Sequence, residues 1–488
     1  MPKLQLRGKD LRKIGFPEGP VISVAINVMQ RHYKHYRPEE ALKILQEVLT
    51  TPTAYENHPE LGNIATALQP KKRENPGEIA LAVSGIPFNI FGSAFIEDGA
   101  LSQMETAAKL PVALAGALMP DAHAGYGLPI GGVLATENSV IPYGVGVDIG
   151  CRMSLSIFDI PPSDLLKDED HYLKILNSST RFGAGEQLEN PADHPVLYRE
   201  EFEDIAFLAA LKHKARLQLG TSGSGNHFAE FGIVEIQEED PVMQLKPGIY
   251  CGFLTHSGSR ALGANIANHF TKIAMQKKRL PKEAQHLAWF DLDEEEGIEY
   301  WKAMNLAGDY ASACHEVIHD KISKALQSSP LRRIENHHNF AWKEKLDGRE
   351  VIVHRKGATP AGQDVLGIIP GSMTAPGYIV KGKGQPASLH SASHGAGRAM
   401  SRTKALSMIT KNQMKDTLEK HGVRLIGGGL DEAPFAYKDI EMVMQQQKQL
   451  IDVTGKFYPK LVKMDSAPPH KRKKKSPGYK DEDLSEGE

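Results

Sequence analysis

The sequence lacks several features that would place it in a membrane or outside the cell. No run of about 18 or more apolar residues is present, so we expect no membrane-spanning helix. The N-terminal segment MPKLQLRGKDLRKIG is charged throughout and has no apolar stretch of the signal-peptide kind, so we do not expect secretion. Three cysteines, Cys151, Cys251 and Cys314, are too few and too scattered for a disulfide framework. A reduced, cytoplasmic setting is therefore expected, with a thiol free to bind metal.

The sequence also has no large excess of positive or of negative charge. The 58 lysines and arginines nearly balance the 60 aspartates and glutamates, which gives a formal net charge of −2. An RNA partner would therefore need a local basic surface, because there is no global positive field. With 488 residues, 41% of them hydrophobic and 24% charged, the chain has the composition of a globular protein with a large core.

The pattern along the chain predicts three regions. Residues 1–75 form a small, mainly helical N-terminal extension, because 20–33 and 38–49 carry apolar residues at helical spacing. Residues 465–488 are rich in Pro, Lys and acidic residues and are predicted to be a disordered tail. The basic run at 471–475 could contact RNA phosphates, although such a block more often serves only as a solvated tail.

The main body, residues 76–464, is predicted to be α+β. Helices are expected at 102–117, 286–326, 398–412 and 440–453, and short β runs such as FAEFGIVEI, GIYCGFLTHSG and REVIVHRKG alternate with loops. We expect mixed β-sheets that line a deep central cleft, with the helices packed outside and histidine-bearing loops opening into the cleft.

Two potential metal ligands lie three residues apart in the segment PYGVGVDIGCRM. Asp148 and Cys151 place a carboxylate and a thiol at the tip of one glycine-containing loop, as chelation requires. The alternative is a turn aspartate beside a small buried thiol, which is common for free cysteine. The segment alone leaves both interpretations open.

Histidines recur in similar glycine-framed loops. His227 follows a Gly/Ser loop in GTSGSGNHF, and His256 ends a β run in FLTHSGSR. His337 and His338 are adjacent, so on a strand only one of them would face a given site. Each histidine alone is more often a satisfied polar residue than a ligand. Together with Asp148 and Cys151, they predict a transition-metal site of N, O and S ligands.

A further histidine has surroundings suited to phosphate. His394 precedes Gly-Ala-Gly-Arg398, which offers bare backbone and a guanidinium beside an imidazole. This pattern favours a histidine that acts on phosphorus as a nucleophile or acid/base group. Asp121 and His123, in PDAHAGYG, are either acid/base or ligand-orienting groups, or simply residues of a turn. No Walker loop, zincin helix, CxxC pair or Rossmann fingerprint is present.

Seven ordered segments of the main body together resemble one enzyme family. They are PDAHAGYGLPIGG, VIPYGVGVDIGC, GSGNHFAE, THSGSR, HHNFAW, IIPGSM and SHGAGR, and they are similar to those of the RtcB-type RNA ligases over roughly residues 80–464. The resemblance implies an RtcB-like α+β fold and a GTP-dependent, manganese-using enzyme. Such an enzyme joins RNA 3′-phosphate or 2′,3′-cyclic phosphate ends to 5′-hydroxyl ends, in RNA repair or tRNA splicing, and often works with the small activating protein archease.

The resemblance also implies a two-manganese centre. Its ligands would be Asp148, Cys151, His227, His256 and His338. In the expected grouping, Asp148, Cys151 and His256 hold one ion, and Cys151 bridges to a second ion held by His227 and His338. The sequence does not settle which histidine serves which ion.

His394 matches the family histidine that carries GMP covalently. The segments that match guanosine-nucleotide contacts comprise Asn226, His227, Phe228, Ala229, Glu230, His338, Asn339, Pro370, Gly371, Ser372, Met373, His394, Gly395, Ala396, Gly397 and Lys463.

The chain departs from the family pattern at three places. Thr374 and Gly377 stand where the family usually has Gly and Ser, and Lys463-Met464 replaces the usual Lys-Gly ending. These departures concern nucleotide preference and RNA substrate and leave the metal ligands and His394 untouched. Two other interpretations are a metal-dependent RNA phosphoesterase, which would open cyclic phosphates without sealing, and a non-catalytic RNA-binding relative.

Overall fold

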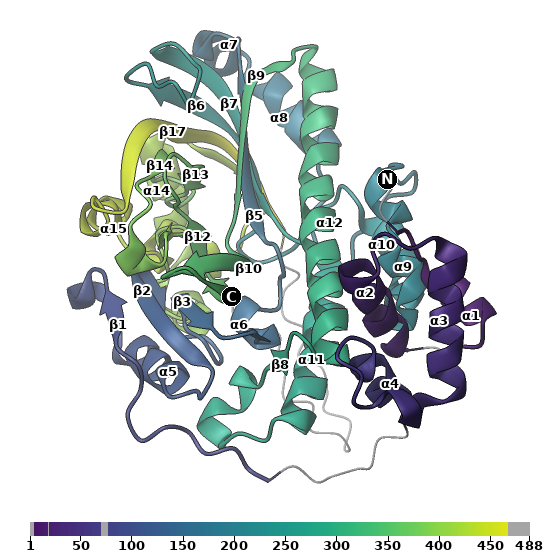
Figure 1. The fold of residues 1–488 in the computed structure, drawn as a ribbon. Helices are drawn as coiled ribbons and strands as arrows, with labels where there is room; N and C mark the ends of the chain where they lie inside the picture. Colours follow the sequence, from purple (N-terminus) through teal and green to yellow (C-terminus); the bar gives the residue numbers. More distant parts are fainter. Residues whose placement is uncertain (1–3, 18, 70–76, 467–488) are drawn as a thin grey trace, which may run out of the picture.

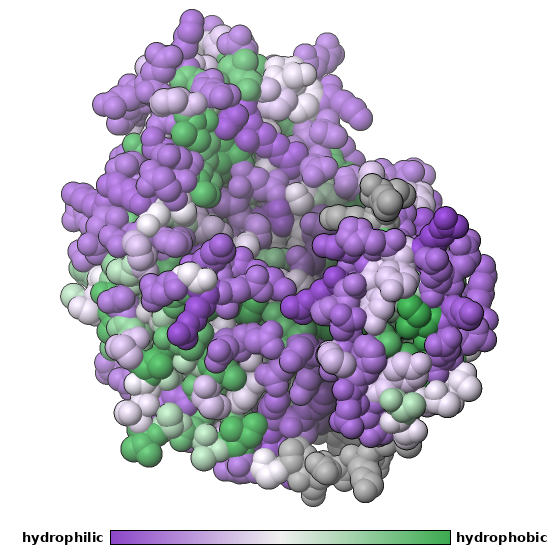
Figure 2. Space-filling view, in the orientation of Figure 1, coloured by the Kyte–Doolittle hydropathy of each residue, from purple (hydrophilic) through white to green (hydrophobic). Residues whose placement is uncertain are grey.

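The computed structural model describes residues 4–17, 19–69 and 77–466. The predicted tail lies outside the described residues from position 467 onward. The fold is α+β, as predicted, with β-sheets on one side of a long central helix and a group of short helices on the other (Figure 1). None of the helices in the described ranges has the length and apolar character needed to cross a bilayer. The face seen in Figure 2 is mostly hydrophilic, with scattered apolar patches.

The N-terminal residues form a compact helical unit with its own apolar cluster. Its helices are α1 (Gly8–Lys13), α2 (Val21–His32), α3 (Pro38–Thr50) and α4 (Gly62–Leu68). The start of α3 is capped because the Arg37 N–H donates to the Glu40 carboxylate at 2.9 Å. The unit packs on the main body, where Ile298 of the central helix contacts its cluster and Asp204 accepts a hydrogen bond from the Gly8 N–H at 3.0 Å.

An eight-stranded sheet forms the larger β-layer. Its strands follow the order β13-β14-β17-β6-β7-β5-β9, and β16 pairs with β17 beside this path. The bounds are β5 (Arg152–Phe158), β6 (Phe228–Ile236), β7 (Gly248–Ser257), β9 (Pro330–His337), β13 (Leu366–Ile369), β14 (Gly377–Gly382), β16 (Arg424–Ile426) and β17 (Ile451–Met464). Helices α7 (Pro162–Lys167), α8 (Glu169–Ser179) and α12 (Glu295–Leu326) contact this sheet.

A second sheet carries five strands in the order β1-β2-β3-β11-β10. The bounds are β1 (Phe88–Ile90), β2 (Ala113–His123), β3 (Ile130–Thr136), β10 (Asn339–Leu346) and β11 (Arg349–Lys356). Two short pairs complete the β structure, β12 (Ala358–Pro360) with β15 (Ser391–Ser393), and β4 (Ser139–Val140) with β8 (Phe290–Asp291).

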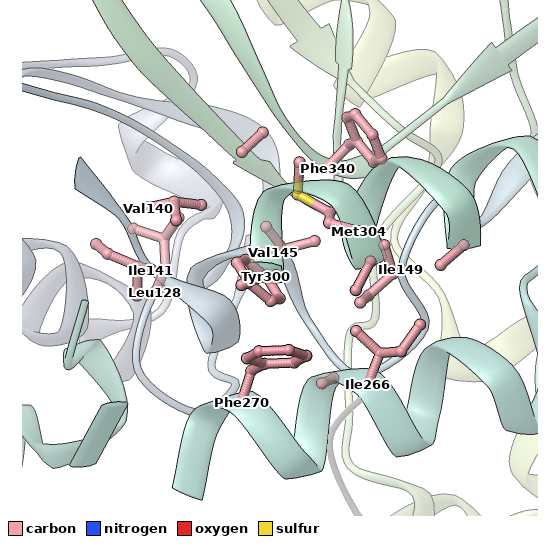
Figure 3. Close-up of a cluster of buried hydrophobic side chains, with 14 of the residues drawn as sticks. Leu128, Val140, Ile141, Val145, Ile149, Ile266, Phe270, Tyr300, Met304 and Phe340 are labelled. Carbon is pink, nitrogen blue, oxygen red and sulfur yellow. The ribbon is translucent and has the colours of Figure 1, made fainter. Parts of the chain in front are cut away.

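The remaining helices surround these layers. They are α5 (Asp98–Ala108), α6 (Pro142–Val145), α9 (Glu201–Asp204), α10 (Ala206–Gln218), α11 (Arg260–Lys277), α13 (Arg402–Met408), α14 (Lys411–His421) and α15 (Ile440–Gln446). The main apolar cluster lies between α11, α12 and the loop after α6, where Phe270, Tyr300 and Met304 gather near Val145 and Ile149 (Figure 3). Full burial of such a side chain contributes about 1.5–3 kcal/mol. This packing anchors the segment that carries Asp148.

The predicted ligands lie at one end of four neighbouring strands of the eight-stranded sheet, β6, β7, β5 and β9. The start of β5 lies opposite the end of β7, with Arg152 paired to Ser257, and opposite the end of β9, with Arg152 paired to His337. The start of β6 lies beside the end of β7, since Phe228 pairs with His256. Because these neighbours are antiparallel, residues just before β5 and β6 meet residues at the ends of β7 and β9.

Four predicted helices are wrong in part. Residues 102–117 begin in α5, but the chain leaves the helix at Ala108 and enters β2 at Ala113. The helix expected at 440–453 ends at Gln446, and β17 begins at Ile451. The helix expected at 398–412 is divided into α13 and α14, whose first turns begin at residues 402 and 411. The helical region expected at 286–326 contains β8, and its long helix α12 begins only at Glu295. In the first two cases pairing within a sheet overrides local helical spacing.

Candidate active site

Five predicted metal ligands lie close together at the ends of β5, β6, β7 and β9. The Cys151 Sγ lies 3.4 Å from the His227 Nε2 and 3.2 Å from the His256 Nε2. The His227 Nε2 lies 3.0 Å from the Asp148 Oδ2, and the His256 Nε2 lies 3.2 Å from the His338 Nε2. One thiol therefore stands between a carboxylate–imidazole pair and an imidazole–imidazole pair. This donor set suits a transition metal.

The backbone fixes the loop that carries Asp148 and Cys151. The Gly150 N–H donates to the Asn339 carbonyl at 2.7 Å, and the His338 N–H donates to the Cys151 carbonyl at 3.0 Å. Gly150 has a φ of +71°, and a Cβ there would lie 2.8 Å from the Gly308 Cα of α12. The tight turn therefore requires glycine, and α12 holds the thiol in place.

Protonation states of the cluster suit metal binding. Burial alone would raise the pKa of Asp148, but hydrogen bonds with His227 and Ser259 bring it below its usual value, which favours the carboxylate. Burial holds the pKa values of His256 and His338 well below the usual value, and neighbouring histidines lower both further. The His256 Nδ1 lies 3.2 Å from the Asn226 carbonyl oxygen and donates a hydrogen bond to it. The other ring nitrogen, Nε2, therefore carries the lone pair that can bind a metal.

His394 is oriented by a fully buried carboxylate. Its Nδ1 lies 2.7 Å from the Asp121 Oδ2, which also accepts the His394 backbone N–H at 3.1 Å and the Gly395 N–H at 3.4 Å. Burial would raise the pKa of Asp121, but the His394 imidazole lowers it overall. Nδ1 is thus the protonated nitrogen, and Nε2 carries the lone pair. The His394 ring centroid lies 5.0 Å from that of His338, which puts His394 beside the metal ligands.

A single pocket joins this histidine to the ligand cluster. Its volume is about 1080 Å³ including its open mouth, which is ample for a nucleotide. Residues from the predicted nucleotide set that line it are Asn226, Phe228, Glu230, His338, Asn339, Pro370, Gly371, Ser372, Met373, His394, Gly395, Ala396 and Gly397. His256 lines the pocket too, so a bound molecule would reach both the ligand cluster and His394.

Two residues of the predicted nucleotide set point away from the pocket, and a third belongs to the metal cluster. On β6, Ala229 packs in the apolar cluster under α8, while its neighbours Phe228 and Glu230 line the pocket. On β17, the Lys463 Nζ donates to the Asn177 and Thr180 carbonyls at 3.1 and 3.0 Å, and Val462 and Met464 line the pocket instead. Alternation along a strand explains both cases. His227 contacts Asp148 and Cys151 and is not among the pocket-lining residues.

Asn339 lines the pocket but also braces the backbone around it. Its side-chain amide donates to the Asp148 carbonyl at 3.4 Å, and its Oδ1 accepts the Gly357 N–H at 2.8 Å. His337, the last residue of β9, packs against Phe340 and Trp342 instead. As predicted, only His338 of the adjacent pair turns toward the ligand cluster.

Sequence analysis missed several pocket residues. Lys356 is buried at the end of β11, where its Nζ donates to the Tyr126 carbonyl at 2.6 Å. The signal for Lys356 was its place at a strand end directly before Gly357. Arg402, Glu432 and Tyr437 also line the pocket, and no recognisable spacing in the sequence links them.

Comparison with known proteins agrees with this geometry. Residues 103–464 match the family model described as tRNA-splicing ligase RtcB. The chain is 33% identical to RNA-splicing ligase RtcB of Escherichia coli K12, over 73% of this chain and 92% of that protein. It is 31% identical to tRNA-splicing ligase RtcB of Methanococcus maripaludis, over 67% and 82% of the two chains, and 30% identical to that of Nanoarchaeum equitans, over 77% and 95%. The chain therefore belongs to the RtcB family.

Proposed function

We propose that this protein is an RNA ligase that joins 3′-phosphate or 2′,3′-cyclic phosphate ends to 5′-hydroxyl ends through a covalent GMP on His394. The observation that carries this proposal is that His394, His338 and His256 line one pocket, while the Cys151 Sγ lies 3.2 Å from the His256 Nε2. The His394 and His338 rings lie 5.0 Å apart, and the His338 and His256 Nε2 atoms lie 3.2 Å apart. A nucleophilic imidazole beside a phosphate-binding metal site is the arrangement that nucleotidyl transfer needs.

Asp148, Cys151, His227, His256 and His338 would hold two divalent ions, with Cys151 available to both, and manganese is the ion we propose. Asp148 and His227 would hold one ion and His256 and His338 the other, because the His227 Nε2 lies 3.0 Å from the Asp148 Oδ2 and the His256 Nε2 lies 3.2 Å from the His338 Nε2. This grouping differs from the one expected from the resemblance, which placed His256 with Asp148. Bound ions would neutralise phosphate charge and orient the phosphorus for in-line attack.

The chain's own groups account for the first chemical step. The His394 Nε2 would attack the α-phosphorus of GTP, forming a P–N bond as the bond to pyrophosphate breaks. Asp121 would stabilise the positive charge that develops on the ring, through its 2.7 Å contact with Nδ1. No proton has to leave Nε2, because Nδ1 carries the only ring proton.

The later steps would take place in the same pocket. The guanylate would pass from His394 to the RNA 3′-phosphate, and the 5′-hydroxyl would then displace GMP and seal the strand. Glu230 lines the pocket, and burial raises its pKa well above the usual value. The two N–H donors of a guanine edge would pair with this carboxyl group and favour its ionised form.

Labelled GTP tests the proposal. After incubation with manganese and α-labelled GTP, the wild-type protein should keep the label through denaturation, and His394→Ala should keep none. A matched control is His213→Ala, which removes an exposed histidine on α10 and should label normally. Retained label in His394→Ala, or a wild-type protein that opens cyclic phosphates without ever taking label, would refute the ligase assignment and favour the phosphoesterase.

A further inference from the structure

One imidazole that lines the pocket, that of His123, has no role in the steps described so far. His123 ends β2 and lines the same pocket as His394. Its Nδ1 lies 3.1 Å from the main-chain carbonyl oxygen of Asp121. A carbonyl only accepts hydrogen bonds, so Nδ1 must be the donor and the neutral ring carries its lone pair on Nε2. Asp121 therefore fixes two imidazoles, His394 through its carboxylate and His123 through its backbone.

The segment that carries His123 is held on both sides. The Lys438 Nζ donates to the carbonyls of Pro120 and Ala122 at 3.3 and 2.7 Å, which fixes the end of β2. Immediately after His123, the Ala124 N–H donates at 2.5 Å to Glu97, the residue that precedes α5. The ring is thus positioned by contacts that do not depend on a ligand, as a preorganised catalytic group requires.

Burial keeps His123 neutral before substrate binds. Burial, His394 and Lys438 together lower the pKa of His123 to about 4, although the hydrogen bond to the Asp121 carbonyl and the Asp121 charge act to raise it. An anionic phosphate in the pocket would raise this pKa again, because an opposite charge favours the protonated form. The imidazole is therefore free to accept a proton, and more readily once the RNA phosphate is bound.

The sealing step needs such an acceptor. We infer that His123 is the general base that takes the proton from the RNA 5′-hydroxyl as that oxygen attacks the activated 3′-phosphate. A new P–O bond joins the two RNA ends, the P–O bond to the guanylate breaks, and GMP leaves with the bonding electrons. The proton passes to the His123 Nε2 and then to solvent. This inference rests on the proposed ligase function, but it assigns a separate residue to a separate step.

The first and last steps can be separated experimentally. An RNA whose 3′-phosphate already carries guanylate bypasses the labelling of His394, so only sealing to a 5′-hydroxyl RNA is measured. With this substrate in single turnover, His123→Ala and His123→Gln should each seal on the order of 100-fold more slowly than wild type. His394→Ala should seal it far better than either His123 variant, and His213→Ala should match wild type.

Two further measurements distinguish a general base from a structural role. Added imidazole should partly restore sealing in His123→Ala and leave the wild-type rate unchanged. Labelling of His394 with α-labelled GTP should fall by less than a few-fold in both His123 variants. Sealing by His123→Gln at the wild-type rate, or labelling that falls in parallel with sealing, would overturn the inference. If the wild-type protein neither takes label nor seals the activated RNA, the proposed function itself fails.

Discussion

The Asp121 carboxylate accepts a hydrogen bond from the His394 Nδ1 at 2.7 Å and is itself fully buried. The same oxygen accepts two backbone N–H groups from the loop that begins at His394. Side chain and backbone of the histidine are thus fixed by one atom. A charged partner of this kind matters most when the ring becomes positive, which happens when its Nε2 forms a bond to phosphorus.

Asp121→Asn should therefore slow labelling of His394 while preserving the fold. The amide oxygen can still accept the hydrogen bonds, but the negative charge that stabilises the developing imidazolium is lost. We expect a decrease on the order of 100-fold in the single-turnover rate with α-labelled GTP. The control Asp416→Asn alters an exposed carboxylate on α14 and should label at the wild-type rate. A wild-type rate in Asp121→Asn would mean that the charge is not used.

Cys151 should be the residue on which metal binding depends most. A bound ion stabilises the folded protein by about 2.7 kcal/mol when its concentration is 100 times Kd, so manganese should raise the Tm. Cys151→Ala should abolish this rise, and Cys151→Ser should retain part of it, because manganese accepts oxygen ligands. Cys251 is a buried control: burial raises the pKa of its thiol to about 12, and Cys251→Ala should keep the manganese-dependent rise. A wild-type increase in Tm on adding manganese to Cys151→Ala would contradict the proposal that Cys151 is a ligand of both ions.

Glu230 should set nucleotide preference. It lines the pocket between strand neighbours that face the core, and its buried carboxyl group is the acceptor we assign to the guanine edge. Loss of such a contact costs about 1–3 kcal/mol. Glu230→Gln should therefore raise the KM for GTP by roughly 10- to 100-fold in the labelling reaction. The ratio of the labelling efficiency with GTP to that with ATP should decrease at the same time. An unchanged preference for GTP over ATP would mean that the guanine base binds elsewhere in the pocket.

Buried neutral histidines should make the fold sensitive to mild acid. His354 bridges two segments, accepting the Ile141 N–H at 2.9 Å and contacting the Leu134 carbonyl at 3.1 Å, and burial lowers its pKa to about 4. In the unfolded chain the same group titrates near about 6.5. Its contribution to stability is thus present above that value and is lost as pH falls from there toward 4, since the unfolded state binds the proton first.

Each such histidine should add up to about 1.4 kcal/mol per pH unit to the slope of unfolding free energy over this window. Urea unfolding of the apoprotein at several pH values measures the slope. His354→Gln should reduce the slope of unfolding free energy against pH by the amount that corresponds to about one proton. The control His213→Ala, at an exposed position, should leave the slope unchanged. An unaltered slope in His354→Gln would show that His354 is not neutral in the folded state.

Much of the fold and site could be predicted from the sequence, and the errors have physical causes. The ligands were recognisable because they stand at or near strand ends and most have a glycine within two residues, and β5, β6, β7 and β9 bring those ends together. The helix expected at 440–453 was wrong after Gln446, because β17 is defined by pairing with β6 and β14, which lie more than 60 residues away in the chain. Local spacing cannot report such partners.

Side-chain direction was the other limit. Lys463 occupies a position that resembles a nucleotide contact, yet the pleat of β17 turns it toward the carbonyls of residues 177 and 180. A shift of one residue along a strand reverses the face, and no motif in the sequence fixes that register. Lys356 shows the opposite case: it looked like part of an ordinary β run and proved to line the pocket.

Peptide mapping by mass spectrometry tests the central claim most directly. The protein is incubated with manganese and GTP, digested without acid, and searched for a GMP adduct. The account predicts one adduct, on the peptide that contains His394, and its absence when Cys151→Ala or His394→Ala is treated in the same way. An adduct on another residue, or an adduct that forms equally in Cys151→Ala, would contradict it.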